Sequence, residues 1–273
     1  MQNIRITRTI ITVTALALLM MAKPIMAQEQ AIFTKPDVTQ EINTLRVTYR
    51  EQLTTYRNDE RLFVIAQGQF SNLNTLVSLE TAVKATQSVM KSRVQVLKSY
   101  LSLLRLQLIS TTGIDLDQKQ LILSDLDQTL IALDAHAQVI NAATDRAAVN
   151  QAADEFATLK PIIDTLSAEG QLLLSLGRMQ AVYDNSVALK DDLKVEIATS
   201  GGVFQQAERQ RAFTQTEATI ETVRTELRTI IDDSKEDRDK IQGLTSNTVN
   251  RQLLPIHDGL SQIVAFLAEL MTL

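Results

Sequence analysis

The sequence predicts an all-α protein, an elongated antiparallel bundle of five to six long amphipathic helices with coiled-coil-like packing. Three observations lead to this fold class. The 273 residues include only eight Gly and four Pro, so turns are few and the elements between them are long. Residues that favour helices, such as Ala, Leu, Gln and Glu, are abundant, and Trp is absent. Apolar side chains recur every seven residues, which places them along one face of a helix.

The first 27 residues predict a signal peptide that is cleaved. Arg5 and Arg8 precede an apolar run over residues 10–22, and Ala27 is a small residue suited to signal peptidase. The run is shorter than the roughly 20 apolar residues that a membrane-spanning helix needs. An uncleaved N-terminal anchor is the alternative. We therefore expect an exported protein, located in the periplasm, on the cell surface or secreted, with residues 28–273 as a single helical-bundle domain.

The charge of the chain without residues 1–27 limits the classes of partner. Those residues hold three basic and no acidic side chains, which leaves 24 Lys and Arg against 32 Asp and Glu, a net charge of −8. Nucleic acid is not an expected partner, because phosphate binding needs clustered Lys and Arg. The chain has no cysteine, which excludes disulfides, thiol catalysis and Cys-based metal sites.

The first predicted helix opens at Pro36, whose fixed φ suits a first helical turn. It carries an unusual row of aromatic residues at seven-residue spacing, namely Tyr49, Tyr56, Phe63 and Phe70. A row of this kind is typical of a groove for a ligand or of a docking seam for a partner helix. Ordinary bundle core is the alternative, although a buried tyrosine hydroxyl needs a hydrogen-bond partner.

A turn-like cluster over residues 71–75 separates this helix from the next. Ser78 is the expected N-terminal cap of the second helix, and Gly113 is expected to end it as a C-terminal cap. The register of apolar residues shifts across the cluster, which indicates a discontinuity. The two helices either fold back as a hairpin or continue as one rod, and the sequence leaves both open.

Cap residues also place the next helices. Asp115 is expected to cap a third helix, with Gln118 in the capping-box position three residues later. The pattern weakens at Thr144 and Asp145, where we expect a new cap and a short Ala-rich helix that ends at Leu159.

Pro161 is expected to start the next long helix, which ends at a loop over residues 199–202. A fifth helix follows, and its charged stretch over residues 232–240 is expected to face solvent. Pro255 is expected to precede a last apolar helix within residues 253–273. We expect this segment to dock on the bundle, with a position in a lipid interface as the alternative.

Three blocks in the first third of the chain carry a resemblance to a known group. They are Tyr49-Arg50-Glu51 through Asn58-Asp59-Glu60 and Phe63-x-Ile65-Ala66, then Leu76-Val77-Ser78-Leu79-Glu80 through Thr86, then Arg93 and Leu97 to Tyr100-Leu101. Over about residues 40–110 the chain resembles uncharacterised exported helical proteins of reduced-genome, mostly uncultured bacteria. The resemblance implies export and an all-helical fold, and it implies no activity.

No catalytic, cofactor or metal site is predicted. We expect His136 at the surface or boundary of its helix, and neither it nor His257 has a second ligand at metal-binding spacing. Asp115-x-Asp117 lacks the later ligands and the glycine of a calcium loop. Gly201-Gly202 lacks the Lys-Ser/Thr of a phosphate-binding loop, so a turn between helices is the better interpretation.

The function expected from these features is that of an exported, non-enzymatic helical-bundle protein of the cell envelope. It would act in protein–protein interaction or in a structural or assembly role, with an envelope protein as its unknown partner and homo-oligomers as a further possibility. The main alternative is an amphipathic protein that binds lipid or a membrane surface. A sensory input bundle and an enzyme with an unfamiliar acidic site are weaker alternatives.

Overall fold

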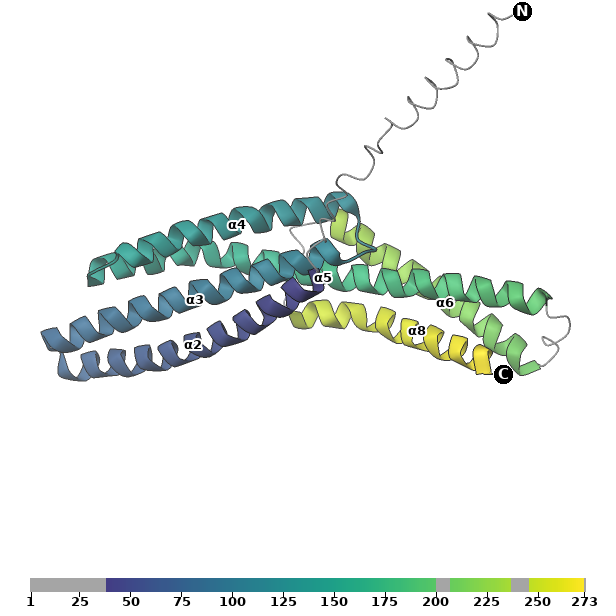
Figure 1. Cartoon of the computed structure of the whole chain (residues 1–273), viewed down its shortest axis with the longest axis horizontal. Coiled ribbons are helices and arrows are strands. Elements are labelled where there is room, and N and C mark those ends of the chain that lie inside the picture. The colour runs from purple at the N-terminus through teal and green to yellow at the C-terminus, as the bar shows by residue number, and fades with distance from the viewer. Residues whose placement is uncertain (1–37, 200–206, 237–245, 273) are drawn as a thin grey trace, which may run out of the picture. The chain divides into compact units, whose positions relative to one another are not determined.

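Figure 1 shows the computed structural model, which describes residues 38–199, 207–236 and 246–272. The chain divides into two units, residues 1–41 and 42–273, and of the first only residues 38–41 are described. The described residues form six α-helices and no strand, so the predicted all-α class is confirmed. The helices are α2 (Val38–Leu73), α3 (Leu76–Ser110), α4 (Leu116–Ala142), α5 (Arg146–Thr199), α6 (Ala207–Glu236) and α8 (Ser246–Thr272).

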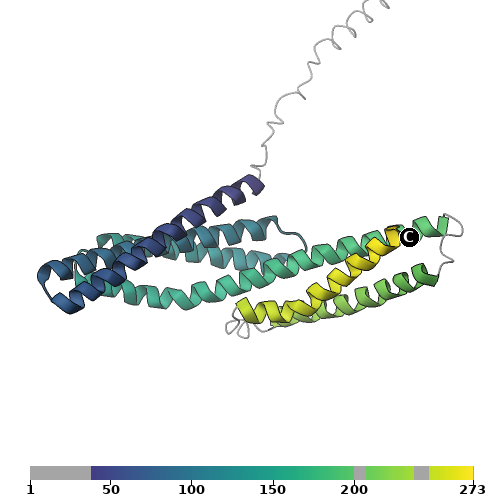
Figure 2. The same cartoon turned by 90° about the horizontal axis from the view of Figure 1, so that it is seen from below.

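Helices α2 and α3 fold back on each other as an antiparallel hairpin, which excludes the continuous rod (Figures 1 and 2). The hydroxyl of Ser99 in α3 donates to Oε1 of Gln52 in α2 at 2.6 Å. The cap of α3 is Thr75 and not Ser78, so that prediction was wrong by three residues. The Thr75 hydroxyl accepts from the Ser78 backbone N–H at 3.2 Å, and the Ser78 hydroxyl accepts from the Thr75 N–H at 3.1 Å. This reciprocal capping box satisfies two backbone donors at once.

In the connection from α3 to α4, the predicted cap Asp115 is confirmed, whereas the roles predicted for Gln118 and Gly113 were wrong. The Asp115 carboxylate accepts from the Gln118 backbone N–H at 3.2 Å, as expected for an N-terminal cap. The Gln118 side chain does not complete a capping box, because it donates to the Ser234 hydroxyl of α6 at 3.2 Å. Helix α3 ends before Gly113, with Thr111 as its C-terminal cap. Gly113 lies in the loop with φ +78°, a conformation that glycine adopts without a steric penalty.

Helix α5 runs without interruption through Pro161, so the prediction of two helices that meet there was wrong. Asp145 caps it as expected, since its carboxylate accepts from the Ala148 N–H at 2.8 Å. Pro255 likewise lies inside α8 and does not precede it. A proline inside a helix costs about 3 kcal/mol because it removes one hydrogen bond and crowds the preceding turn. Both prolines are exposed, and the buried stripes of their helices continue on either side.

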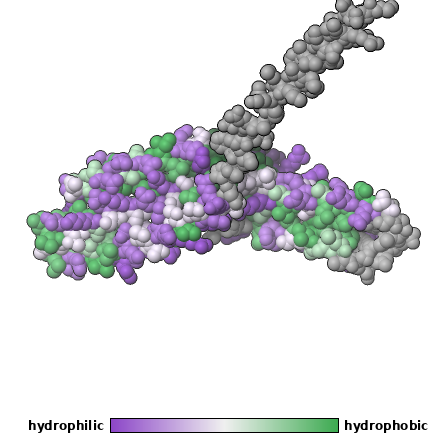
Figure 3. All heavy atoms as spheres, viewed as in Figure 1, coloured by the Kyte–Doolittle hydropathy of each residue, from purple (hydrophilic) through white to green (hydrophobic). Residues whose placement is uncertain are grey.

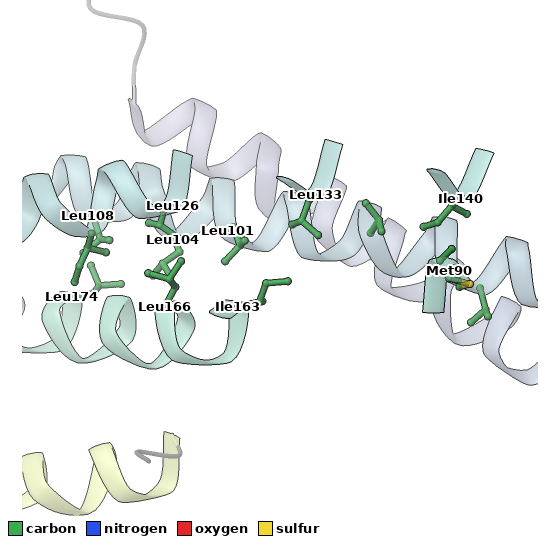
Figure 4. Packing of buried hydrophobic residues seen from close by; sticks show 14 of the residues in the cluster. Met90, Leu101, Leu104, Leu108, Leu126, Leu133, Ile140, Ile163, Leu166 and Leu174 are labelled. Carbon is green, nitrogen blue, oxygen red and sulfur yellow. The ribbon is translucent and has the colours of Figure 1, made fainter. Parts of the chain in front are cut away.

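Residues 42–273 contain two hydrophobic cores that share α5. The first core joins α3, α4 and the first half of α5, and Figure 4 shows its leucine and isoleucine side chains pointing toward one another. The second core joins the second half of α5 to α6 and α8. Residues of the first core with at most 1% exposure include Val94, Leu101, Leu108, Leu126, Leu133 and Ile140. Those of the second core include Val223, Ile256 and Ile263.

Helix α8 places six apolar side chains in the second core, as expected if residues 253–273 dock on the bundle. They are Leu253, Ile256, Leu260, Ile263, Leu267 and Leu270. One segment of the described chain, Arg251–Met271, is also long and apolar enough to cross a membrane, with 33% of it buried inside the structure. The predicted signal peptide, the predicted turn at Gly201-Gly202 and the part of the charged stretch beyond Glu236 lie outside the described residues.

Candidate functional site

The four aromatic residues predicted as a docking seam are all half-buried on α2, whose only buried residue is Ala66. The ring of Tyr49 lies 6.2 Å from the ring of Tyr100 in α3. The guanidinium of Arg146, at the start of α5, lies 5.9 Å from the centre of the Phe70 ring. The seam therefore contacts helices of its own chain, and its use by a partner stays a prediction.

The middle of this seam borders a cavity where all four helices of the first half of the chain meet. The cavity has a volume of about 200 Å³. Its walls are mostly apolar, with Thr86, Arg93 and His136 as the polar exceptions. The lining residues are Phe63 from α2, Thr86, Val89, Met90 and Arg93 from α3, His136 from α4, and Ala153 and Phe156 from α5.

His136 is the most unusual residue of the cavity. It is only 4% exposed, so the expectation of a surface or boundary histidine was wrong. Both ring nitrogens, Nδ1 and Nε2, lack a hydrogen-bond partner among the residues that the structure describes. A buried polar group without a partner costs about 1–3 kcal/mol, and such groups are rare in native proteins. His136 therefore presents an unused hydrogen-bonding group at the wall of a cavity.

The surroundings of His136 favour its neutral form. Burial lowers the pKa of His136 below its ordinary value of 6.5, and the negative charge of Glu155 offsets part of this effect. The Glu155 carboxylate lies 3.9 Å from Nδ1, too far for a hydrogen bond. It accepts instead from the Gln151 side chain at 3.1 Å. A neutral imidazole has one N–H donor and one nitrogen acceptor, so His136 can both donate to and accept from a molecule in the cavity.

Arg93 is the cationic residue of the cavity. Its guanidinium lies 5.3 Å from the centre of the Phe156 ring and 5.9 Å from that of Tyr56. These cation–π contacts hold the guanidinium beside two aromatic rings, and no described residue accepts a hydrogen bond from its N–H groups. Within the described part of the chain, Arg93 forms no ion pair with a carboxylate. The cavity thus combines apolar walls with a positive charge that has no ion-pair partner among the described residues.

A larger cavity of about 590 Å³ lies between α4 and α5 beside Pro161. Asp125 and Glu169 are the carboxylates that line it, and Glu169 is only 3% exposed. Both side chains have interaction partners within the chain. This cavity therefore lacks the unpaired polar group that distinguishes the one at His136.

An open groove runs along α5 and α8 on the outside of the second core. It consists of two adjoining hollows of about 520 and 310 Å³ that share Val182 and Val264. Along α5 the lining extends from Ser175 to Leu189, which corresponds to about 20 Å at ~1.5 Å per residue. Val182, Val264 and Met271 keep 42%, 51% and 64% of their surface exposed. Figure 3 shows hydrophobic residues gathered over this part of the molecule.

A second exposed apolar surface lies at the turn of the α2–α3 hairpin. Leu73, Leu76 and Val77 are 64%, 71% and 73% exposed. These residues belong to the ends of two helices and line none of the cavities described above. They form a small apolar tip at the turn of the hairpin.

The described residues hold no group of three or more His, Asp or Glu side chains suited to a metal ion. His257 is exposed on α8, where its Nδ1 lies 3.4 Å from the neighbouring Asp258 carboxylate. It also lines the larger hollow of the α5–α8 groove.

Comparison of the chain with protein-family models, with curated proteins and with solved structures gives no match. The resemblance over residues 40–110 therefore stays a prediction. The function has to be argued from the cavity and the groove.

Proposed function

We propose that this chain is an exported, non-enzymatic helical-bundle protein of the cell envelope that binds one α-helix of a partner protein in the groove between α5 and α8. The observation that carries the proposal is the length and apolar lining of that groove. A groove of about 20 Å accommodates roughly four turns of a helix. Helices bind in such grooves through apolar residues at positions i, i+3 or i+4, and i+7.

Helix α2 supports the choice of a helix as the occupant. In the first half of the chain, α3, α4 and α5 form the core, and α2 lies on them as a fourth helix. It does so with half-buried rings such as Tyr56 and Phe63 and with little fully buried surface. In the second half, α5, α6 and α8 form a three-helix core. Within the described residues, no fourth helix covers the groove that α5 and α8 leave open.

The charges of the groove favour a partner over a second copy of the same chain. Arg178 and His257 line it, and among the described residues no Asp or Glu does, although the chain as a whole is acidic. Two grooves that faced each other in a two-fold dimer would bring two copies of Arg178 into one apolar interface, with no carboxylate among the lining residues to pair with them. A partner helix with an apolar stripe and an acidic residue opposite Arg178 would complement the groove.

Photo-crosslinking in the cells that produce the protein tests this proposal. A photoreactive phenylalanine analogue replaces Val264 in the groove, and a matched control replaces Thr222, which is exposed on α6. We expect one discrete adduct with a different protein from position 264 and none from position 222. A V182K substitution across the groove should abolish the adduct while the circular dichroism spectrum stays unchanged.

Other outcomes separate the alternatives. An adduct of twice the mass of the chain would mean that the groove binds a second copy. Equal labelling from positions 264 and 222, or no protein adduct from either, would contradict the proposal.

Binding to a membrane surface is the second candidate function. It is favoured by the apolar composition of Arg251–Met271 and by the exposed tip at Leu76 and Val77. The burial of six α8 residues in the second core weighs against it, because they would have to leave that core to enter lipid. Flotation of residues 28–273 with neutral or anionic vesicles would support it. Recovery of all protein in the unbound fraction with both vesicle types would remove it.

A further inference from the structure

We propose that the cavity between α2, α3, α4 and α5 is a binding site for a small organic anion, a carboxylate with a short planar apolar body. This site is separate from the α5–α8 groove, and it does not depend on the function proposed for the groove. The proposal rests on the coincidence of three features: a partly enclosed volume, two polar side chains without a hydrogen-bond partner among the described residues, and aromatic walls.

The volume sets the size of the ligand. A cavity of about 200 Å³ has room for about six or seven water molecules at ~30 Å³ each. An organic molecule of eight to ten non-hydrogen atoms, roughly the size of benzoate, occupies a similar space. Ala153 is exposed, so the cavity opens to solvent beside it.

The polar groups set the charge of the ligand. Arg93 offers N–H donors at the edge of its guanidinium, and a carboxylate is the acceptor whose geometry matches that edge. His136 adds a buried imidazole whose two nitrogens have no hydrogen-bond partner in the described part of the chain. The Thr86 hydroxyl does not donate a hydrogen bond to the ligand, because it already donates to the Ala82 carbonyl at 2.7 Å. A bound carboxylate would satisfy both Arg93 and His136.

The walls set the shape of the rest of the ligand. Phe156 contacts both polar groups, since Arg93 lies over its ring and the His136 ring centre is 5.7 Å away. Phe63, Val89 and Met90 provide the remaining apolar surface. A flat apolar body fits beside these side chains, whereas a second anionic group would lack a counter-charge. Glu155 does not line the cavity, but its carboxylate lies 3.9 Å from His136 Nδ1 and disfavours a second negative charge beside that nitrogen.

Titration of residues 28–273 with benzoate, benzyl alcohol and benzylamine tests the proposal. The readouts are calorimetry and the NMR signals of the His136 imidazole. We expect saturable benzoate binding that shifts the His136 signals, and at least about tenfold weaker binding of the neutral and cationic probes, as a charge-assisted hydrogen bond implies.

Three variants locate the binding. R93M should weaken benzoate binding about 10- to 100-fold. R105Q removes another half-buried arginine of α3, one that pairs with Asp127 at 2.6 Å, and it should leave benzoate binding unchanged. A153F narrows the mouth at an exposed helical position, where folding tolerates the change, and should also weaken binding.

The proposal is overturned if benzoate fails to bind saturably, or if all three probes bind equally. It is also overturned if R93M and A153F, both folded by circular dichroism, bind benzoate as the unchanged protein does. Each of these results would mean that the cavity holds only water or unspecific apolar molecules.

Discussion

The two cores differ in the kind of binding site that lies beside them: a cavity between helices beside the first core, and a groove on the surface beside the second. Around the first core, four helices border a cavity lined by His136 and Arg93, and α2 packs against this core with half-buried rings. Around the second core, three helices pack a nearly apolar interior and leave an open apolar groove outside. Its fully buried polar residue, Thr216, is satisfied by its own helix, since its hydroxyl donates to the Ala212 carbonyl at 2.8 Å.

The two sites therefore suit different kinds of ligand, although α5 contributes to both. A buried, unpaired polar group inside a cavity suits a small polar ligand. A long apolar groove at the surface suits a helix. Helix α5 contributes Phe156 to the cavity and Val182 to the groove.

The largest expected effect comes from truncation of the cores themselves. L133A in the first core and I263A in the second should each lower the free energy of unfolding by about 3 kcal/mol, because both residues are fully buried. Urea unfolding followed by circular dichroism measures this. Since α5 belongs to both cores, we expect a single transition whose midpoint falls in either variant. I131A is the control, and its effect should stay within about 0.5 kcal/mol because Ile131 is 70% exposed. Two transitions, of which each variant shifts only one, would show that the cores unfold independently.

A smaller effect is expected where the α3–α4 loop meets α5. A Cβ atom at Gly113 would lie 2.6 Å from the Gly177 carbonyl oxygen, and its φ of +78° is unfavourable for alanine. G113A should therefore destabilise the protein by about 2 kcal/mol. G68A is the matched comparison, because nothing lies within 4 Å of a Cβ atom at that exposed helical position. It should stabilise by about 0.5–1 kcal/mol through better helix propensity. If G113A and G68A shifted the melting temperature in the same direction, this description of the loop would be contradicted.

The stability of the protein should depend on pH through His136, which is buried beside the first core. The pKa of His136 is lowered in the folded protein by burial, so the unfolded chain binds this proton more tightly. Stability should fall as the pH drops below about 6.5, by at most about 1.4 kcal/mol per pH unit, and the loss should stop below the folded-state pKa. H136F removes the titrating group. Its stability relative to the unchanged protein, from urea unfolding at pH 7.5 and 5, should therefore rise toward acid pH. A constant difference between the two proteins would exclude the assigned environment of His136.

The smallest expected effect on stability distinguishes the groove from the core beneath it. Val264 is 51% exposed and the neighbouring Ile263 is fully buried. V264K should change the free energy of unfolding by no more than about 0.5 kcal/mol. I263K should prevent stable folding, because it places an unpaired charge in an apolar core. If V264K lowered the melting temperature as much as I263K does, the face that carries Val264 would be part of the core and not an open groove.

The features predicted correctly from the sequence are those that depend on local interactions. Asp115 and Asp145 were identified as caps because a carboxylate that accepts from a backbone N–H three residues later acts within one helical turn. Continuity of a helix depends instead on packing over its whole length. Pro161 and Pro255 were therefore misread as helix starts, since the burial on either side of them outweighs the lost hydrogen bond.

The candidate site was only partly accessible to sequence reasoning. Phe63 was identified through its seven-residue spacing, but His136 was assigned to the surface or boundary. Its position three residues after Leu133 and four before Ile140 places it on the same face as these two buried residues, so the signal was present. No comparable signal exists for Arg93. Its role depends on Tyr56 and Phe156, which belong to other helices that only the tertiary structure brings together.

Hydroxyl-radical footprinting of the α5–α8 groove, in producing cells and in the purified protein, is the most direct test of the proposed function. Val264 and Met271 are the reporters, and Leu116 and Ile131, which are exposed on α4, are the reference residues. If a partner helix occupies the groove, the two reporters should be labelled several-fold more slowly in cells than in the purified protein, relative to the reference residues. Equal relative labelling in cells and in the purified protein would show that the groove stays open to solvent, which contradicts the account.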